Sequence, residues 1–346
     1  MEFPQVLVLD ETLTEDDAAE QLAQSVKVLG VDAPFVVASV HGRRLGSALH
    51  GPRAPESPVD DADQAWAGDL GSRARRSGAD AIVAIGGGRC LDVAKLAAAR
   101  AGLTVIAVPT QLSHDGICSP VAVVPGDDGR AESLGAIAPR VVYMPLPTLL
   151  RSPAASVRAG IGDLIANPLA LRDWALASDR GLEETSARAW DLSVESFEMI
   201  KPLLASGERP DPGDPALLRR LGDALVLSGM AMICAGTSRP ASGGEHEISH
   251  AMDHRYRGRA LHGAQVAFGC IVSVALYGED TDAFRARLAR LGLPDHPRQL
   301  GLDLSEMVAL LLEAPDTRPG RFTILEDADL DHGTARALVR RIWADL

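Results

Sequence analysis

Lysine is almost missing from this chain of 346 residues, in which it occurs only as Lys27, Lys95 and Lys201. Aromatic residues are also few, at 4% of the chain, whereas apolar residues make up 46%. This balance suits close-packed helices around a buried parallel sheet. The formal net charge of −13 argues against a nucleic-acid groove and against binding to an anionic membrane surface.

Cysteine pairs and long apolar runs are missing as well. The cysteines are Cys90, Cys118, Cys234 and Cys270. They are scattered without a C-x-x-C pair, so we expect reduced, buried thiols and neither disulfides nor a zinc framework. The longest uncharged stretches, around 224–238 and 266–278, are too short to cross a bilayer, and the first residues lack the basic segment of a signal peptide. We therefore expect a soluble cytoplasmic protein.

Strand patterns are confined to the first part of the chain. Short apolar runs bounded by Gly, Pro or Asp predict buried parallel strands at 6–9, 35–39, 81–85, 105–108 and 141–144. Helical patterns between them lie at 16–29, 62–77 and 91–100, and a loop rich in Pro and Gly is expected at 50–60. Strands that alternate with helices of this length predict βαβ units in an open parallel sheet.

Beyond residue 152 only helical patterns follow. They cover 153–180, 184–205, 215–235, 245–255, 263–277, 282–291, 304–313 and 333–345. We therefore predict an α/β fold, with a Rossmann-like parallel-sheet domain at 1–152 and an all-helical domain at 153–346. In this architecture the active site is expected in the cleft between the two, at the carboxyl ends of the strands.

A triple glycine follows the third predicted strand. Gly86, Gly87 and Gly88 end the apolar run, and a helix begins after them. Glycines at such a turn let backbone N–H groups approach a pyrophosphate, although a tight turn that needs positive φ is the alternative interpretation. The next strand-end loop, 108–116, is rich in hydrogen-bonding groups, as ligand-binding loops are, but Ser, Asp and Gly are also good turn formers.

Histidines gather in one short part of the second half. His246 and His250 are four residues apart, so on a helix they share a face, and His262 follows. A catalytic zinc ion usually takes three protein ligands and leaves one position open. The surrounding residues are polar, and they include Glu245, Glu247, Asp253, His254 and Arg255. The alternative to a metal site is therefore a solvated polar face of a helix.

Two other polar positions also have two interpretations each. Asp163 lies in an apolar helical stretch, where it can cap the following helix or supply an oxygen ligand to the same metal as His246 and His262. Ser242, followed by two glycines at an expected helix start, can belong to an anion-binding turn or act only as a cap.

These motifs together resemble the sn-glycerol-1-phosphate dehydrogenase family, which belongs to the wider dehydroquinate synthase and iron-containing alcohol dehydrogenase fold. The resemblance rests on segments 86–95, 109–120, 162–167 with 172–174, 239–253, 261–266 and 318–325. The sequence Ser-His-Asp-Gly at 113–116 is specific to this family. The resemblance runs in order from about residue 80 to 330, and before residue 80 it is only architectural.

The resemblance implies roles for individual residues. Asp163, His246 and His262 would bind a catalytic metal, zinc by default, with nickel or iron as alternatives. Asp115, Asp163 and His250 would face the substrate in catalysis, with His250 working near its natural pKa. The positions implied for contacts with NAD(P)H are Gly86, Gly87, Gly88, Arg89, Cys90, Leu91, Asp92, Thr110, Gln111, Leu112, Ser113 and Ser119.

The reaction implied is the NAD(P)H-dependent interconversion of a small phosphorylated ketone and its alcohol, namely dihydroxyacetone phosphate and sn-glycerol 1-phosphate. Another phosphate- or phosphonate-bearing carbonyl is the nearest variant. A dehydroquinate-synthase-like cyclase is less favoured, because that family uses several lysines in its site. A catalytically inactive relative is disfavoured because the whole metal-ligand set is present.

The remaining expectations concern the cofactor and the partners. Arg43 and Arg44, after the second strand, can accept a ribose 2′-phosphate, so use of NADPH is expected beside NADH. His254 is expected to take no part in the chemistry. We also expect a homo-oligomer, no nucleic-acid partner and no insertion into a membrane.

Overall fold

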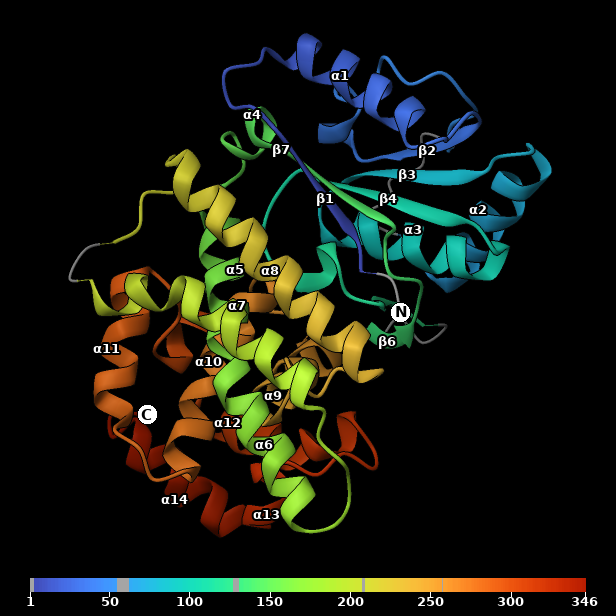
Figure 1. Cartoon of the computed structure of the whole chain (residues 1–346). Helices are drawn as coiled ribbons and strands as arrows, with labels where there is room; N and C mark the ends of the chain where they lie inside the picture. Colours follow the sequence, from blue (N-terminus) through green and yellow to red (C-terminus); the bar gives the residue numbers. More distant parts are fainter. Residues whose placement is uncertain (1–2, 55–61, 127–130, 207–208, 257) are drawn as a thin grey trace.

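The computed structural model describes residues 3–54, 62–126, 131–206, 209–256 and 258–346. A five-stranded parallel sheet in the order β1-β7-β4-β3-β2 forms its first part (Figure 1). The strands are β1 (Gln5–Leu9), β2 (Pro34–Ala38), β3 (Ala81–Gly86), β4 (Thr104–Pro109) and β7 (Val141–Pro145). Each of them was predicted from an apolar run, and the predicted α/β fold class is confirmed.

Helices cover both faces of this sheet. They are α1 (Glu15–Val28), α2 (Gln64–Arg76), α3 (Gly88–Ala101) and the short α4 (Leu146–Leu149). Successive residues of a strand point to opposite faces, so Val83 packs in one apolar cluster with Leu22 of α1. Ile82 and Ala84 pack in the other cluster, with Leu91 of α3. The sheet is therefore buried on both sides, as its continuous apolar runs indicate.

An antiparallel hairpin of β5 (Val121–Pro125) and β6 (Ala131–Gly135) was not predicted. β6 is mostly exposed and polar, so it carries no apolar pattern. Contacts with α3 hold the hairpin and the loop before it. Lys95, which is 0% exposed, donates to the carbonyl oxygens of Gly116, Ser119 and Val121. Asp92 accepts the backbone N–H of Val123 at 3.1 Å.

The chain after residue 153 is helical in its described parts. A single helix was predicted at 153–180, but two are present, α5 (Ala154–Ile165) and α6 (Asn167–Asp179). Pro168 lies in the first turn of α6, where its missing N–H and fixed φ start a new helix. The others are α7 (Ala187–Ala205), α8 (Pro215–Ala235), α9 (Gly244–Tyr256), α10 (His262–Leu276), α11 (Thr281–Leu291), α12 (Leu304–Glu313), α13 (Ile324–Ala328), which was not predicted, and α14 (His332–Ile342).

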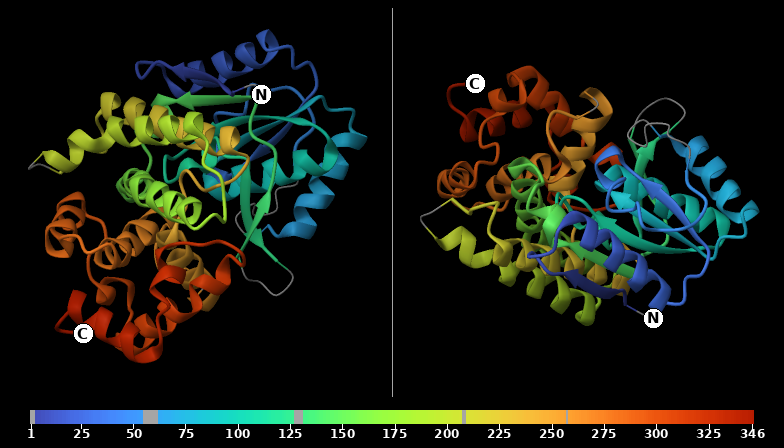
Figure 2. Two further views of the ribbon diagram at one scale, coloured as in Figure 1. Left: turned by 60° about the horizontal axis from the view of Figure 1, so that its bottom comes forward. Right: turned by 90° about the horizontal axis from the view of Figure 1, so that it is seen from above.

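These helices gather beside the sheet, with α13 and α14 farthest from α1 (Figures 1 and 2). One apolar cluster joins Ala107 and Val142 of the sheet to Phe268 and Ile271 of α10. The domain boundary at residue 152 stays a prediction. In the described ranges, none of the helices combines the length and apolar character that a membrane crossing requires.

Two smaller predictions concern the loop and the cysteines. Of the loop expected at 50–60, residues 55–60 lie outside the described part of the chain. The thiols of Cys90, Cys118 and Cys270 are free and buried, as expected. Cys234 is also free but only half-buried.

Candidate active site

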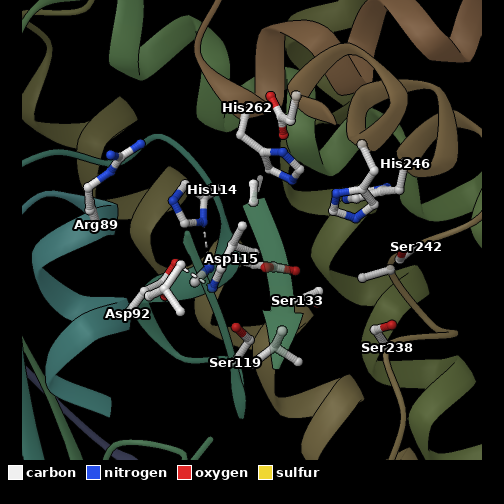
Figure 3. Close-up of a pocket in the computed structure, with 18 of the residues that line it drawn as sticks. Arg89, Asp92, His114, Asp115, Ser119, Ser133, Ser238, Ser242, His246 and His262 are labelled. Carbon is white, nitrogen blue, oxygen red and sulfur yellow. Dashed lines mark hydrogen bonds between the residues drawn. The ribbon is translucent and has the colours of Figure 1, made fainter. Parts of the chain in front are cut away.

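A cavity of about 570 Å³ is enclosed by α3, the loop after β4, the hairpin, α9 and the start of α10 (Figure 3). It lies at the carboxyl ends of β3 and β4, as predicted. The predicted site residues that line it are Arg89, Asp92, Asp115, Ser119, His246, His250 and His262. Three separate sequence motifs thus contribute to one cavity.

Asp163, His246 and His262 come together at this cavity from α5, α9 and α10. Each offers one ligand atom, and these atoms all lie within 4.8 Å of one another. The Nε2 atoms of His246 and His262 are 3.8 and 3.9 Å from Oδ1 of Asp163. A carboxylate oxygen and two imidazole nitrogens at this spacing suit a divalent ion such as zinc.

The other ring nitrogen of each histidine is also engaged. Nδ1 of His246 lies 2.9 Å from Oε1 of Glu245, and Nδ1 of His262 lies 3.3 Å from Oγ of Ser249. Such partners orient a ligating histidine and leave the Nε2 lone pair for a metal. Burial is the main cause that lowers the pKa of both imidazoles to about 3, and the charges of Arg318 and Arg321 add to it at His246. Both rings are therefore neutral near pH 7, which is the form that binds metal.

The alternative interpretations of these residues are wrong. His246, His250, Glu245 and Glu247 are buried, so this part of α9 is not a solvated face. Asp163 lies inside α5 and does not cap α6, because its Oδ2 accepts the backbone N–H of Asp115 at 2.9 Å. The carboxylate of Asp163 thus joins the metal-ligand cluster to the loop after β4.

Asp115 is held by a buried polar chain. Oδ2 of Asp115 accepts from Oγ of Ser228 at 2.9 Å, and Asn167 in turn donates to Ser228. Burial raises the pKa of Asp115 to about 6, against the lowering effect of the bond from Ser228. Burial, and then the charge of Asp115, raise the pKa of Asp163 well above its ordinary value. A bound cation would relieve this repulsion between two neighbouring carboxylates.

His250 lies on the same face of α9 as His246, with ring centroids 6.4 Å apart. It stands outside the ligand cluster, and its Nε2 accepts from the guanidinium of Arg318 at 2.9 Å. Burial and the charge of Arg318 lower the pKa of His250 well below its ordinary value. The expectation that His250 works near its natural pKa is therefore wrong.

The triple glycine forms the turn between β3 and α3, with Gly87 at the N-cap position. None of Gly86, Gly87 and Gly88 has positive φ, so the alternative explanation of a strained turn is wrong. Glycine is required here because neighbouring side chains pack directly against the backbone. A Cβ on Gly87 would lie 2.3 Å from Nε2 of Gln111, and one on Gly88 would lie 2.1 Å from Nε2 of His114. No side chain caps this helix start, which favours an anionic group there.

The other residues expected to contact NAD(P)H differ in whether their side chains face the apolar core or the cavity. The side chains of Cys90, Leu91 and Leu112 pack in the apolar core, so only their backbone atoms can face a ligand. The other members, Asp92, Thr110, Ser113 and Ser119, are buried polar residues near the turn or the cavity. Arg44, expected beside a 2′-phosphate, pairs instead with Glu15 and Asp16 at 2.7 and 3.1 Å.

His114 was not singled out from the sequence, although it belongs to the Ser-His-Asp-Gly segment. Its ring fits between Gly88 and Gly116, and a Cβ on Gly116 would lie 2.3 Å from its Cε1. Nδ1 of His114 accepts the N–H of Gly116 at 3.0 Å, so the ring proton lies on Nε2. The ring also packs edge-on against His262, with centroids 5.7 Å apart. His114 thus fills the space between the glycine turn and the metal-ligand cluster.

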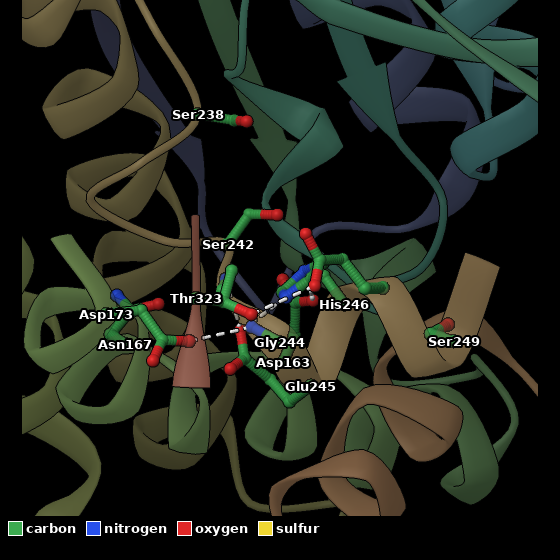
Figure 4. Close-up of polar contacts among 12 residues, drawn as sticks. Asp163, Asn167, Asp173, Ser238, Ser242, Gly244, Glu245, His246, Ser249 and Thr323 are labelled. Atoms are coloured by element: carbon green, nitrogen blue, oxygen red, sulfur yellow. Dashed lines mark hydrogen bonds and ion pairs between the residues drawn. The ribbon is translucent and has the colours of Figure 1, made fainter. Parts of the chain in front are cut away.

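At the start of α9 the backbone N–H groups of Gly243 and Gly244 are already hydrogen-bonded, and the side chain of Ser242 does not cap the helix (Figure 4). The N–H of Gly243 donates to Glu245 at 2.6 Å, and the N–H of Gly244 donates to Asp173 at 2.8 Å. Two buried carboxylates therefore occupy the donors that an anion would need. The hydroxyl of Ser242 is buried and has no hydrogen-bond partner.

Comparisons with known proteins agree with this geometry. A model of the iron-containing alcohol dehydrogenase family matches residues 1–153. A glycerol-1-phosphate dehydrogenase (NAD(P)+) of Cenarchaeum symbiosum is 38% identical over 258 residues, which cover 75% of this chain and 71% of that protein. This chain belongs to the glycerol-1-phosphate dehydrogenase family. A member from Aeropyrum pernix is 35% identical over 319 residues, 91% of this chain and 88% of its own. The match therefore extends before residue 80, where only an architectural likeness was expected.

Solved structures show the same fold across almost the whole chain. A probable glycerol dehydrogenase of Sinorhizobium meliloti has a TM-score of 0.75 at 18% identity, covering 99% of this chain and 97% of that one. The sulfoacetaldehyde reductase of Bifidobacterium kashiwanohense, in complex with NAD+, has a TM-score of 0.68 at 14% identity and full coverage of both chains, 100% each.

The close packing of His114 against Gly88 in this member of the glycerol-1-phosphate dehydrogenase family provides a testable prediction. Exchanging Gly88 for Ala should destabilise the fold by about 1–3 kcal/mol and raise the KM for the nicotinamide cofactor, because the added methyl group overpacks against His114. Urea unfolding and steady-state kinetics measure the two effects. Gly135→Ala is the control, since a Cβ there meets nothing within 4 Å. An unchanged KM would contradict a role for this turn in cofactor binding.

Proposed function

We propose that the protein is a metal-dependent NAD(P)H oxidoreductase that interconverts dihydroxyacetone phosphate and sn-glycerol 1-phosphate. The observation that carries this proposal is the cluster of one carboxylate and two neutral imidazoles, with ligand atoms within 4.8 Å, whose two imidazoles line a large cavity. The names of the relatives supply the substrate, and the glycine turn beside the same cavity supplies a place for the cofactor.

The residues present fit a divalent ion. Asp163, His246 and His262 would hold it, and three protein ligands leave a position open for the oxygen of the substrate. When bound, such an ion acts as a Lewis acid on that oxygen and stabilises the charge that develops during hydride transfer. Zinc, nickel and iron all accept this ligand set, and zinc is our choice among them.

The cofactor would lie along the glycine turn, with its pyrophosphate at the start of α3. Arg89, Asp92 and Ser119 line the side of the cavity nearest this turn. When bound, NAD(P)H supplies the hydride. Because Arg44 is paired with acidic residues of α1, we propose NADH as the preferred cofactor and keep NADPH as the alternative.

The substrate would meet Asp115 and His250. Nε2 of His250 accepts from Arg318, so the proton of this neutral ring lies on Nδ1, the atom that can donate to an oxygen. Asp115 already accepts from Ser228 and can hold a proton near neutral pH, since burial raises its pKa to about 6. These two groups are our candidates for proton transfer to and from the hydroxyl of the substrate.

A cyclase like dehydroquinate synthase finds no support in the cavity. Its lining contains no lysine among the described residues. Lys95 is buried against Asp92, and Lys201 pairs with Glu198 on the surface. The expected homo-oligomer, like the cytoplasmic location, stays a prediction.

The amount of NADH oxidised per product formed distinguishes the dehydrogenase reaction from the cyclase reaction. The protein, supplied with zinc and excess dihydroxyacetone phosphate, should oxidise NADH in an amount equal to the glycerol 1-phosphate formed, and NADPH is assayed in parallel. Chiral analysis of the product should give the sn-1 enantiomer. Turnover of a carbonyl substrate without net consumption of either reduced cofactor would contradict the proposal and favour a cyclase.

The bond between Glu245 and His246 provides a prediction about metal affinity. In Glu245→Gln the carboxylate that accepts from Nδ1 of His246 becomes a neutral amide, so zinc affinity should fall about 10- to 100-fold. Competition with a chelating indicator measures this change. Glu195→Gln, an exposed position on α7, is the matched control. Equal zinc affinity in the Glu245 variant and in the control would show that this carboxylate does not support the ligand.

A further inference from the structure

Arg318 lines the cavity, and the reaction proposed above uses it only as the donor to Nε2 of His250. It follows the short 3-10 helix η5 (Pro315–Thr317), far in the sequence from the metal ligands. The segment 318–325 resembles its family counterpart, but that resemblance implied no role for it. Its side chain is held between three elements: the hairpin, the segment before α9, and α9 itself.

All hydrogen-bond acceptors of Arg318 that the structure describes are neutral. The guanidinium donates to Oγ of Ser238 and to Oγ of Ser133, each at 3.3 Å, and to Nε2 of His250 at 2.9 Å. Within the described ranges, no carboxylate lies at ion-pair distance from Arg318. A guanidinium that is partly removed from water without a counter-charge is costly, which favours an anionic ligand.

A second cation, Arg321, shares Ser238 as a hydrogen-bond acceptor with Arg318. Arg321 donates to Oγ of Ser238 at 2.8 Å and to the carbonyl oxygen of Ser242, and no described carboxylate lies at ion-pair distance from it. The neighbouring Arg239 is different, because it pairs with Glu183. The pair of cations Arg318 and Arg321 suits a phosphate group, which carries close to two negative charges near pH 7.

The hydroxyl groups beside these arginines are hydrogen-bond donors toward the cavity. Oγ of Ser238 accepts from both Arg318 and Arg321, which leaves its own hydrogen to donate. Oγ of Ser242 has no partner, although this residue is only 4% exposed. Figure 3 shows both serines on one wall of the cavity beside His246, with Arg89 on the opposite wall. An anionic group with several acceptor oxygens can accept hydrogen bonds from these donors.

We propose that Arg318, together with Ser238 and Ser242, binds the phosphate group of the substrate, and that Arg321 supports this site through its hydrogen bonds to both serines. The inference rests on the proposed function, and it identifies the residues that select a phosphorylated ketone. The ring of His250 is hydrogen-bonded to Arg318, and its centroid lies 6.0 Å from that of His262, so Arg318 is close to the metal-ligand cluster. A three-carbon skeleton can therefore place its carbonyl at the metal-ligand cluster and its phosphate at Arg318.

The test compares dihydroxyacetone phosphate with dihydroxyacetone, which has the same carbonyl and no phosphate. In Arg318→Gln the KM for dihydroxyacetone phosphate should rise about 100-fold or more, because two charge-assisted hydrogen bonds are lost. The KM for dihydroxyacetone should change much less than the KM for dihydroxyacetone phosphate. Arg255→Gln is the control, since Arg255 pairs with Glu313 on the surface of α9. Ser238→Ala, which removes a single donor, should raise the same KM about tenfold and is the milder variant if the arginine exchange disturbs folding.

Binding of inorganic phosphate to the zinc-loaded protein provides a readout without turnover. Calorimetry should detect binding to the wild type and to Arg255→Gln, and a loss of binding in Arg318→Gln. If Arg318→Gln keeps the wild-type preference for dihydroxyacetone phosphate over dihydroxyacetone, the phosphate site is overturned while the proposed function stands. If the wild type binds phosphate through Arg318 but does not reduce dihydroxyacetone phosphate, the proposed function fails and the anion site remains.

Discussion

The Asp163→Asn variant should lose kcat/KM for dihydroxyacetone phosphate by about 1,000-fold or more, because several kcal/mol of Lewis-acid stabilisation depend on a bound metal. Asn has the same shape as Asp and can still accept the backbone N–H of Asp115. Its amide would, however, replace the only anionic ligand atom in the cluster with His246 and His262. The loss should therefore come from the metal and not from the loop after β4.

Metal content and activity have to be measured on the same preparation. Elemental analysis should show that Asp163→Asn carries much less zinc than the wild type after both are dialysed against the same buffer. Asp179→Asn, at the exposed end of α6, controls for the loss of a negative charge and should match the wild type. A variant at Asp163 that retained both zinc and full activity would remove this carboxylate from the ligand set.

The His250→Asn variant should lower kcat about 100- to 10,000-fold, the usual contribution of a group that transfers a proton. Its zinc content should not change, since His250 stands outside the cluster of ligand atoms. This separation matters because His250, four residues after His246, shares its face of α9. Spacing alone would assign both histidines to one metal.

The matched control for His250→Asn is His254→Asn, one further turn along the same helix. His254 lies 3.0 Å from the carbonyl oxygen of Ala131 in the hairpin, so its exchange should leave kcat unchanged. Loss of zinc from the His250 variant would show that His250 is a ligand. An unaltered kcat would show that another group, with Asp115 the first candidate, handles the proton.

The sheet could be predicted from the sequence because a buried parallel strand is an apolar run without interruption. Val83 and Ile82 face different helices, so both positions must be apolar. The hairpin of β5 and β6 could not be predicted in this way. Its position depends on hydrogen bonds made by Lys95 and Asp92 of α3, which lie more than twenty residues before their partners in the sequence.

The candidate site could be predicted from the sequence only in part, because its geometry depends on how distant helices pack. A helical spacing of four brought attention to His246 and His250, but only the packing of α5, α9 and α10 decides which imidazole faces Asp163. Polar residues around these histidines suggested a solvated surface, whereas Glu245 is fully buried and accepts from the backbone N–H of Gly243. No pattern along the chain distinguishes an exposed glutamate from one that is buried and hydrogen-bonded.

The role of Arg318 could not be predicted from the sequence either. Its contacts, Ser133, Ser238 and His250, lie far away in the sequence, and each comes from a different element. Arginine is common in this chain, where lysine is almost missing, so its presence in a loop carried no signal. The role of this residue depends on the neutral partners that surround it, which only the folded structure reveals.

The central claim, that the cluster of Asp163, His246 and His262 supports a metal-dependent reduction, has one direct test. Protein freed of metal by a chelator and then dialysed is assayed for NADH oxidation with dihydroxyacetone phosphate while zinc is added back. The rate should be close to zero without metal, rise with added zinc, and level off at about one ion per chain, as expected for a single three-ligand site. Full activity in the metal-free protein, or no recovery with zinc, nickel or iron, would contradict the claim.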